Sequence, residues 1–165
     1  MRLLTVCACI LACGSAQQVH SQVFSMEQVN DSTSFLVLRT DSTTDKWKLP
    51  YPVYQFQTGD VDGDGSIDAM VGVIKRTRFR PEKGRRLFIF KNKNSLIRPL
   101  WMGSKLGGIL VDFKYTTDGV VRSLEKTLKD EYVVAEYKWQ GFGLGFERFL
   151  IVKVSKEEAT RIFNQ

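Results

Sequence analysis

Four aspartates that lie close together are the residues of this chain best suited to bind an ion. They fall within nine positions and are followed at once by an apolar run. Carboxylates this close repel one another by about 1 kcal/mol per pair at ~4 Å even in water, and a divalent cation between them would remove that cost. Counted from Asp60, their spacing is that of a calcium loop, with Gly65 at the sharp turn. The predicted ligands are Asp60, Asp62, Asp64, Ser66 and Asp68.

The predicted ion is calcium, because these ligands are hard oxygens and no Cys or His lies nearby to favour a softer metal. The only histidine of the chain is His20. The twelfth loop position is Val71, where an EF-hand has a bidentate Glu, and the flanking residues alternate like strands. The sequence therefore predicts a calcium loop between two strands. A solvated acidic turn, in which Asp and Gly serve only the backbone, stays open as the alternative.

A strongly basic segment, KRTRFRPEKGRR at residues 75–86, follows the apolar run. We expect a hairpin whose tip is PEKG (81–84), with Arg76, Arg78 and Arg80 on one face of a strand. Such a row of guanidinium groups can bind an anionic polysaccharide, lipid headgroups, a partner protein or the carboxylates of the acidic loop itself, and it can equally be a charged edge that prevents aggregation. The candidate binding residues are Arg76, Arg78, Arg80, Lys83, Arg85 and Arg86.

Signals for catalysis are weak. The chain has no nucleophile-elbow, zinc-helix or phosphate-loop motif, and His20 alone cannot supply a histidine-based triad. Two carboxylates can still hydrolyse a glycosidic bond, and the candidates are Asp112, Asp118, Glu136 and Glu147. Aromatic side chains can form a carbohydrate platform, although strand alternation explains most of them as core; these are Trp47, Tyr51, Tyr54, Trp101, Trp139, Phe142 and Phe146.

The elements that must position these residues are mainly β-strands. Short runs rich in Val, Ile, Phe and Tyr, bounded by turn residues, predict strands at 34–40, 51–57, 69–74, 86–90, 108–115, 131–139 and 146–154. TTDG (116–119) predicts a hairpin tip. Ser155 and Glu158 form a capping box for a short C-terminal α-helix. Residues 123–131 fit either a helix or a charged strand pair, and the fold class predicted is all-β and mostly antiparallel.

The N-terminus has the pattern of an export signal. One basic residue, Arg2, precedes an apolar run and then small residues, which predicts a signal peptide over 1–16. A lipoprotein signal that ends before Cys13 is the alternative, and lipidation there would tether the protein to a membrane. We expect a flexible segment over 17–33 and a single β-rich domain over 34–165. Its location would be periplasmic, cell-surface or extracellular.

The residues FQTGDVDGDGSIDAMVG (56–72) resemble the calcium-binding blade of FG-GAP or VCBS-type repeats in integrin-like β-propellers, and RRLFIFKN (85–92) resembles the next strand of such a blade. The resemblance implies that the aspartates and Gly59 belong to a calcium loop that leads into a strand of small apolar residues. A propeller needs four to eight blades, and this chain has one acidic loop. The expected arrangement is therefore a blade-like sheet, a partial propeller or a sandwich.

These patterns predict an exported, calcium-stabilised interaction module that binds a protein or an anionic polysaccharide. The net charge of +6 is moderate and favours anionic partners; an exported protein is not expected to meet nucleic acid, and contact with a membrane would arise only through lipidation at Cys13. The alternative function is a small polysaccharide-acting hydrolase with paired carboxylates. A third reading is a domain that completes a larger assembly.

Overall fold

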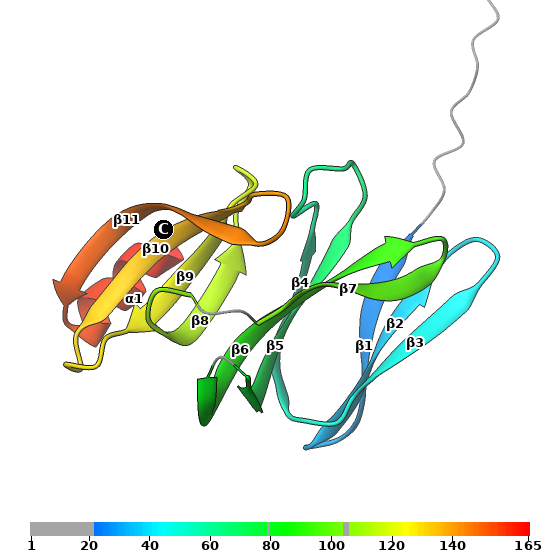
Figure 1. Ribbon diagram of the computed structural model, residues 1–165, viewed down its shortest axis with the longest axis horizontal. Coiled ribbons are helices and arrows are strands. Elements are labelled where there is room, and N and C mark those ends of the chain that lie inside the picture. Colours follow the sequence, from blue (N-terminus) through cyan, green and yellow to red (C-terminus); the bar gives the residue numbers. More distant parts are fainter. Residues whose placement is uncertain (1–21, 79, 104–105) are drawn as a thin grey trace, which may run out of the picture.

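The computed structural model describes residues 22–78, 80–103 and 106–165, and within them the protein is all-β with one short C-terminal helix. Eleven strands form three antiparallel sheets, which follow one another along the long axis of the molecule (Figure 1). The first sheet consists of β1 (Val23–Asn30), β2 (Thr33–Arg39) and β3 (Thr44–Leu49). The fold class predicted from the sequence is confirmed.

The other two sheets have four strands each. The central sheet contains β4 (Val53–Gly59), β5 (Asp68–Thr77), β6 (Arg80–Lys93) and β7 (Leu96–Met102). The third contains β8 (Ile109–Tyr115), β9 (Val121–Lys126), β10 (Tyr132–Trp139) and β11 (Leu144–Val154). Strands pair in sequence order within each sheet, as in a blade, but the described residues form no closed propeller.

Both faces of the central sheet are buried, which explains the unbroken apolar run after the aspartates. On β5, Ala69, Val71 and Val73 face the first sheet, whereas Met70 packs against the third sheet. Successive side chains of a strand point to opposite faces, so a strand covered on both sides carries apolar residues at every position. The central sheet therefore holds the acidic loop, which joins β4 to β5, on a rigid support.

The helix α1 (Lys156–Asn164) closes the other face of the third sheet. Ser155 is its N-cap and accepts a hydrogen bond from the Glu158 N–H (3.2 Å), which confirms the predicted start. Ala159 and Phe163 are buried against Leu124 of β9 and Val134 of β10. A helix this short is stabilised mainly by such packing.

Several local predictions need correction. Residues 123–131 contain no described helix, because β9 ends at Lys126 and β10 begins at Tyr132. The flexible segment expected over 17–33 contains β1 at residues 23–30. PEKG is not a hairpin tip: Thr77 pairs with Arg80, so the chain reverses between them and 81–84 lies within β6 beside a bulge. TTDG is a tip, where the Gly119 N–H donates to the Thr116 carbonyl (3.0 Å).

Candidate metal centre and basic hairpin

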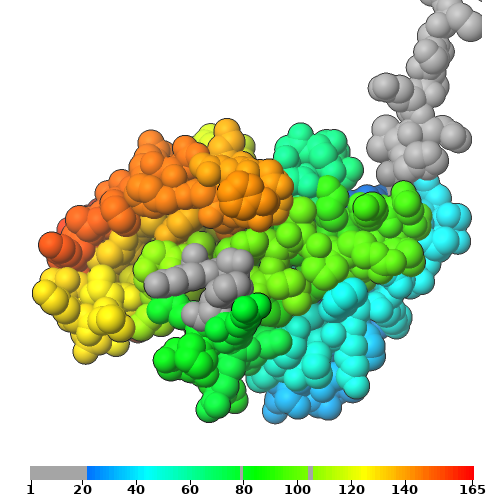
Figure 2. Space-filling model, in the orientation of Figure 1, coloured from blue at the N-terminus to red at the C-terminus, as the bar shows by residue number. Residues whose placement is uncertain are grey.

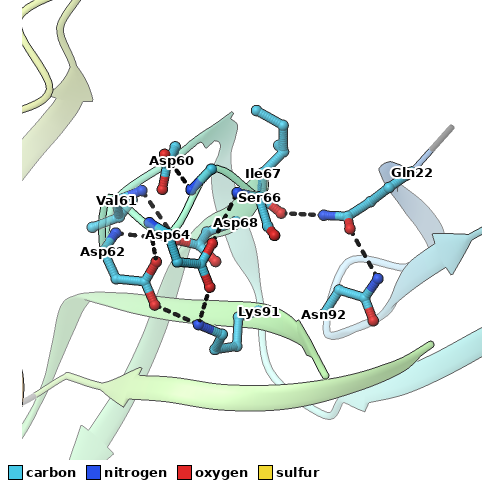
Figure 3. A network of polar contacts seen from close by, with 11 residues as sticks. Gln22, Asp60, Val61, Asp62, Asp64, Ser66, Ile67, Asp68, Lys91 and Asn92 are labelled. Carbon is cyan, nitrogen blue, oxygen red and sulfur yellow. Dashed lines mark hydrogen bonds and ion pairs between the residues drawn. The ribbon is translucent and has the colours of Figure 1, made fainter. Parts of the chain in front are cut away.

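The loop between β4 and β5 brings three of the predicted aspartates together (Figure 3). One carboxylate oxygen each of Asp60, Asp62 and Asp68 lies within 4.8 Å of the other two, so the cluster could hold a metal ion. The loop can curl in this way because Gly63 and Gly65 adopt positive φ angles of 73° and 84°, which glycine reaches at little steric cost. The Gly65 N–H also donates to Asp60 Oδ2 (2.9 Å).

Asp68 is the most informative member of the cluster, because its side chain is buried with an exposed fraction of 0%. Its Oδ2 accepts a hydrogen bond from the Val61 N–H (3.0 Å). Its Oδ1 and the Oδ1 of Asp60 are buried and have no hydrogen-bond partner among the described residues. A buried acceptor without a partner costs about 1–3 kcal/mol, and more when it is charged. These two oxygens are therefore suited to coordinate a cation.

Asp64 lies outside this group of three. Its Oδ1 accepts a hydrogen bond from the Ser66 N–H (2.8 Å), and its Oδ2 is 2.7 Å from Lys91 Nζ. The same ammonium group is 2.5 Å from Asp62 Oδ2. These contacts raise the pKa of Lys91 and lower that of Asp64. Direct ligation by Asp64, and by the carbonyl of Ser66, stays a prediction.

The loop is anchored by contacts with the core, with β8 and with the residue before β1. Val61 is buried in the core between the central and third sheets. The Tyr115 hydroxyl of β8 donates to the Asp60 carbonyl (2.6 Å). Gln22, just before β1, donates to the Ile67 carbonyl (2.5 Å). An ion bound in this loop would therefore affect the packing of the whole domain.

Without a metal, the charge on Asp68 should make the protein less stable as the pH rises. Burial, aided by the negative charge of Asp62, raises the pKa of Asp68 to about 7. The unfolded chain releases this proton near pH ~4. The folded state thus binds more protons between about pH 4 and 7, and the free energy of unfolding falls with rising pH over that interval. Urea titrations in chelator at several pH values measure this slope, and Asp68→Asn should flatten it; an unchanged slope in the variant would contradict the assignment.

Lys91→Gln should strengthen cation binding while weakening the metal-free protein. The ammonium group neutralises Asp62 and Asp64 when no metal is present, but it repels an incoming cation. Removing it should tighten binding by roughly three- to tenfold, since a unit charge at this range contributes about 1 kcal/mol or more. Calorimetric titration with calcium measures the change, with Lys93→Gln, exposed on the same strand, as the control. Weaker binding would mean that Lys91 instead holds Asp62 in place.

The basic hairpin divides into two parts. Arg76 and Arg78 are exposed, and because β5 ends at Thr77 they do not form one strand face with Arg80, contrary to the prediction. The other four candidates line a cavity between the hairpin and β8; they are Arg80, Lys83, Arg85 and Arg86, of which Lys83 and Arg85 are also exposed to solvent. In Figure 2 the hairpin projects, in green, from the lower edge of the molecule.

The carboxylates considered for catalysis have mainly structural surroundings. Glu136 is buried and forms ion pairs with Arg122 (2.8 Å) and Arg148 (2.7 Å). Burial raises its pKa, but the hydrogen bonds from the two arginines outweigh burial and the pKa is lowered. Asp118 and Glu147 are exposed. Of the aromatic candidates, Phe142 and Phe146 are exposed, while the others are buried or pack against the core.

Lys91 and Tyr115 are the site residues that sequence reasoning missed. Each lies on a strand remote from the loop in sequence, and only the strand register and the packing of the sheets bring it there. No helix in the described ranges is long and apolar enough to cross a membrane. The segment that carries the predicted signal and Cys13 lies outside the described residues. Comparison of the chain with protein-family models, with curated proteins and with solved structures finds no match in any of the three.

Proposed function

We propose that the acidic loop binds calcium and that the ion stabilises an exported interaction module. The observation that carries this proposal is the pair of buried, unpartnered oxygens, Asp60 Oδ1 and Asp68 Oδ1, beside the carboxylate of Asp62. Calcium suits the site better than magnesium because it accepts irregular arrangements of oxygen ligands at 2.3–2.6 Å, whereas magnesium requires a near-ideal octahedron. The resemblance to FG-GAP and VCBS-type loops supports the same ion.

The role of the ion in this proposal is to fix the connection between β4 and β5. The loop contacts residues before β1 and on β8, so calcium that holds the loop also supports the stacking of the sheets. At a calcium concentration about 100 times the dissociation constant, binding adds about 2.7 kcal/mol to the free energy of unfolding. The module then presents the basic hairpin to a protein or an anionic polysaccharide, with Arg76 and Arg78 as the exposed arginines that lie outside the cavity lining.

Calorimetric and thermal titrations with calcium and with magnesium test the metal, in wild type, Asp62→Ala and Asp64→Ala. We expect calcium to bind more tightly than magnesium, and Asp62→Ala to reduce affinity more than Asp64→Ala, because Asp64 lies outside the converging group. A melting temperature that responds to neither calcium nor chelator would refute the proposal.

Binding to immobilised heparin, with and without calcium, tests the interaction surface. Arg76→Gln combined with Arg78→Gln should lower the salt concentration at which the protein elutes, since each exposed charge contributes to binding an anionic polymer. The matched control is Lys46→Gln combined with Lys48→Gln on β3, which removes the same charge from another sheet. Equal losses in the two double variants would show that only net charge matters.

A further inference from the structure

A cavity of about 270 Å³ lies between the β5–β6 hairpin and the start of β8, and its lining combines cations with apolar side chains. The hairpin contributes the cations Arg80, Lys83, Arg85 and Arg86. The apolar lining includes Trp101, Leu106, Ile109 and Leu110. Glu82 is the one acidic residue among the described residues that line it. An anion with an apolar group attached would complement both kinds of side chain.

Arg86 is the residue of this cavity whose surroundings best suit an anionic ligand. Its exposed fraction is only 8%, yet within the described ranges no carboxylate forms an ion pair with it. Its guanidinium group donates to the backbone carbonyls of Arg85 (2.7 Å) and Glu82 (2.6 Å), while its Nε is buried without a partner. A buried cation left without a counter-charge is costly, and pairing with an anion offsets that cost.

The neighbouring arginines are already held in position. Arg80 Nη2 donates to the Gly108 carbonyl (3.0 Å), and Arg85 donates to the Val111 carbonyl with its guanidinium 4.6 Å from the centre of the Tyr54 ring. Because backbone carbonyls and a ring face carry no formal charge, these contacts orient the cations without neutralising them. Arg80 and Arg85 therefore keep their positive charge at the cavity while their guanidinium groups are held in place.

The cavity has room for an apolar chain as well as a charged head, and it adjoins a second cavity of about 570 Å³, with which it shares Arg80, Gly108, Ile109 and Leu128. We propose that this cavity binds a small amphipathic anion, with a carboxylate or phosphate head at Arg80 and Arg86 and an apolar chain against Trp101, Leu106 and Leu110. This inference does not depend on calcium, and it goes beyond the proposed function, which uses Arg76 and Arg78.

Calorimetric titration with octanoate, octyl phosphate, acetate and octylammonium tests the proposal. Octanoate or octyl phosphate should bind, and comparing the two identifies the preferred head. Acetate lacks the apolar body and octylammonium has the opposite charge, so each should bind at least tenfold more weakly. The proposal would be overturned if acetate bound as well as octanoate, or if octylammonium bound as well as either anion. It would also be overturned if neither octanoate nor octyl phosphate bound at millimolar concentration.

Substitutions locate the ligand. Arg86→Gln should weaken octanoate binding by at least tenfold, whereas Arg76→Gln, which removes an exposed charge from the same hairpin, should change it less than twofold. Because Arg86→Gln can disturb folding, Ile109→Glu is a second variant. Ile109 is partly exposed at the cavity wall. A carboxylate there should repel the anion and weaken octanoate binding by at least tenfold. A folded Ile109→Glu protein with wild-type affinity would overturn the proposal. Heparin binding that persists in Arg86→Gln while octanoate fails to bind wild type would leave the proposed function standing alone.

Discussion

Replacing Asp68 with asparagine is expected to abolish the stabilisation of this protein by calcium while leaving the metal-free protein at least as stable above neutral pH. In wild type, calcium at about 100 times its dissociation constant should add about 2.7 kcal/mol. In a domain of this size that corresponds to roughly 8 °C in melting temperature, at about 3 °C per kcal/mol. The variant should lose this gain, because a neutral amide replaces the buried carboxylate and weakens calcium binding by about 100-fold or more.

The expected stability of the metal-free variant follows from the burial of the Asp68 carboxylate. Asp68 is completely buried, and one of its oxygens has no partner among the described residues. Asparagine keeps an oxygen that can accept from the Val61 N–H and removes the charge, so chelated Asp68→Asn should melt at or above the temperature of chelated wild type. Asp118→Asn, in an exposed turn, is the control for the change in net charge. A variant that keeps the calcium response would exclude Asp68 as a ligand.

Gly59→Ala should destabilise the protein by about 1–3 kcal/mol, which is typical of overpacking in a filled interior. A Cβ atom at position 59 would lie 2.3 Å from Cδ1 and Cε1 of the Tyr115 ring, far inside van der Waals contact. Tyr115 would have to move, and its hydroxyl would then lose the hydrogen bond to the Asp60 carbonyl. We therefore expect weaker calcium binding as well, by about tenfold, together with a fall of roughly 3–9 °C in melting temperature.

Two further variants separate the clash from the lost hydrogen bond. Tyr115→Phe keeps the ring and removes the hydroxyl, so it should cost only about 1 kcal/mol. The double variant Gly59→Ala/Tyr115→Ala removes the clash. Its loss of stability should therefore be smaller than the sum of the losses in Gly59→Ala and Tyr115→Ala. Gly143→Ala, where the nearest atom lies 3.4 Å from the added Cβ, is the control for glycine replacement. Gly59→Ala with wild-type stability and affinity would contradict this account.

The acidic loop could be predicted from the sequence because its information is local. The aspartates and the glycines that turn the backbone all fall between Asp60 and Asp68, so their spacing reflects their geometry directly. The sequence does not indicate in the same way which carboxylate oxygens lie close together. Asp64 turns towards Lys91 on β6, and that contact depends on the register between β5 and β6.

The strands that escaped prediction lack the usual strand signal. In β7, Pro99 interrupts the apolar pattern; proline is tolerated there because β7 is an edge strand of the central sheet. In β3, charged residues alternate with the few apolar ones, and half of the residues of β1 are polar. All three are edge strands, and most of their residues are exposed or only partly buried, so packing selects few apolar side chains there.

The basic hairpin shows a different limit. The composition of residues 75–86 indicates a positive surface, but it cannot tell which guanidinium groups turn inward. The bulge opposite Lys75 and Thr77 shifts the register of β6. Arg86 pairs with Val73, before this bulge, and is buried, while Arg76 stays exposed.

The order of the strands has a consequence for how the chain acquires its structure. Every strand in the described part of the chain pairs only with its neighbours in sequence, so each pairing closes a short loop and loses little chain entropy. Topologies dominated by such local pairings tend to fold quickly. Each sheet can therefore nucleate as soon as its own hairpins are available, and the sheet nearest the N-terminus can do so before the rest of the chain has been synthesised.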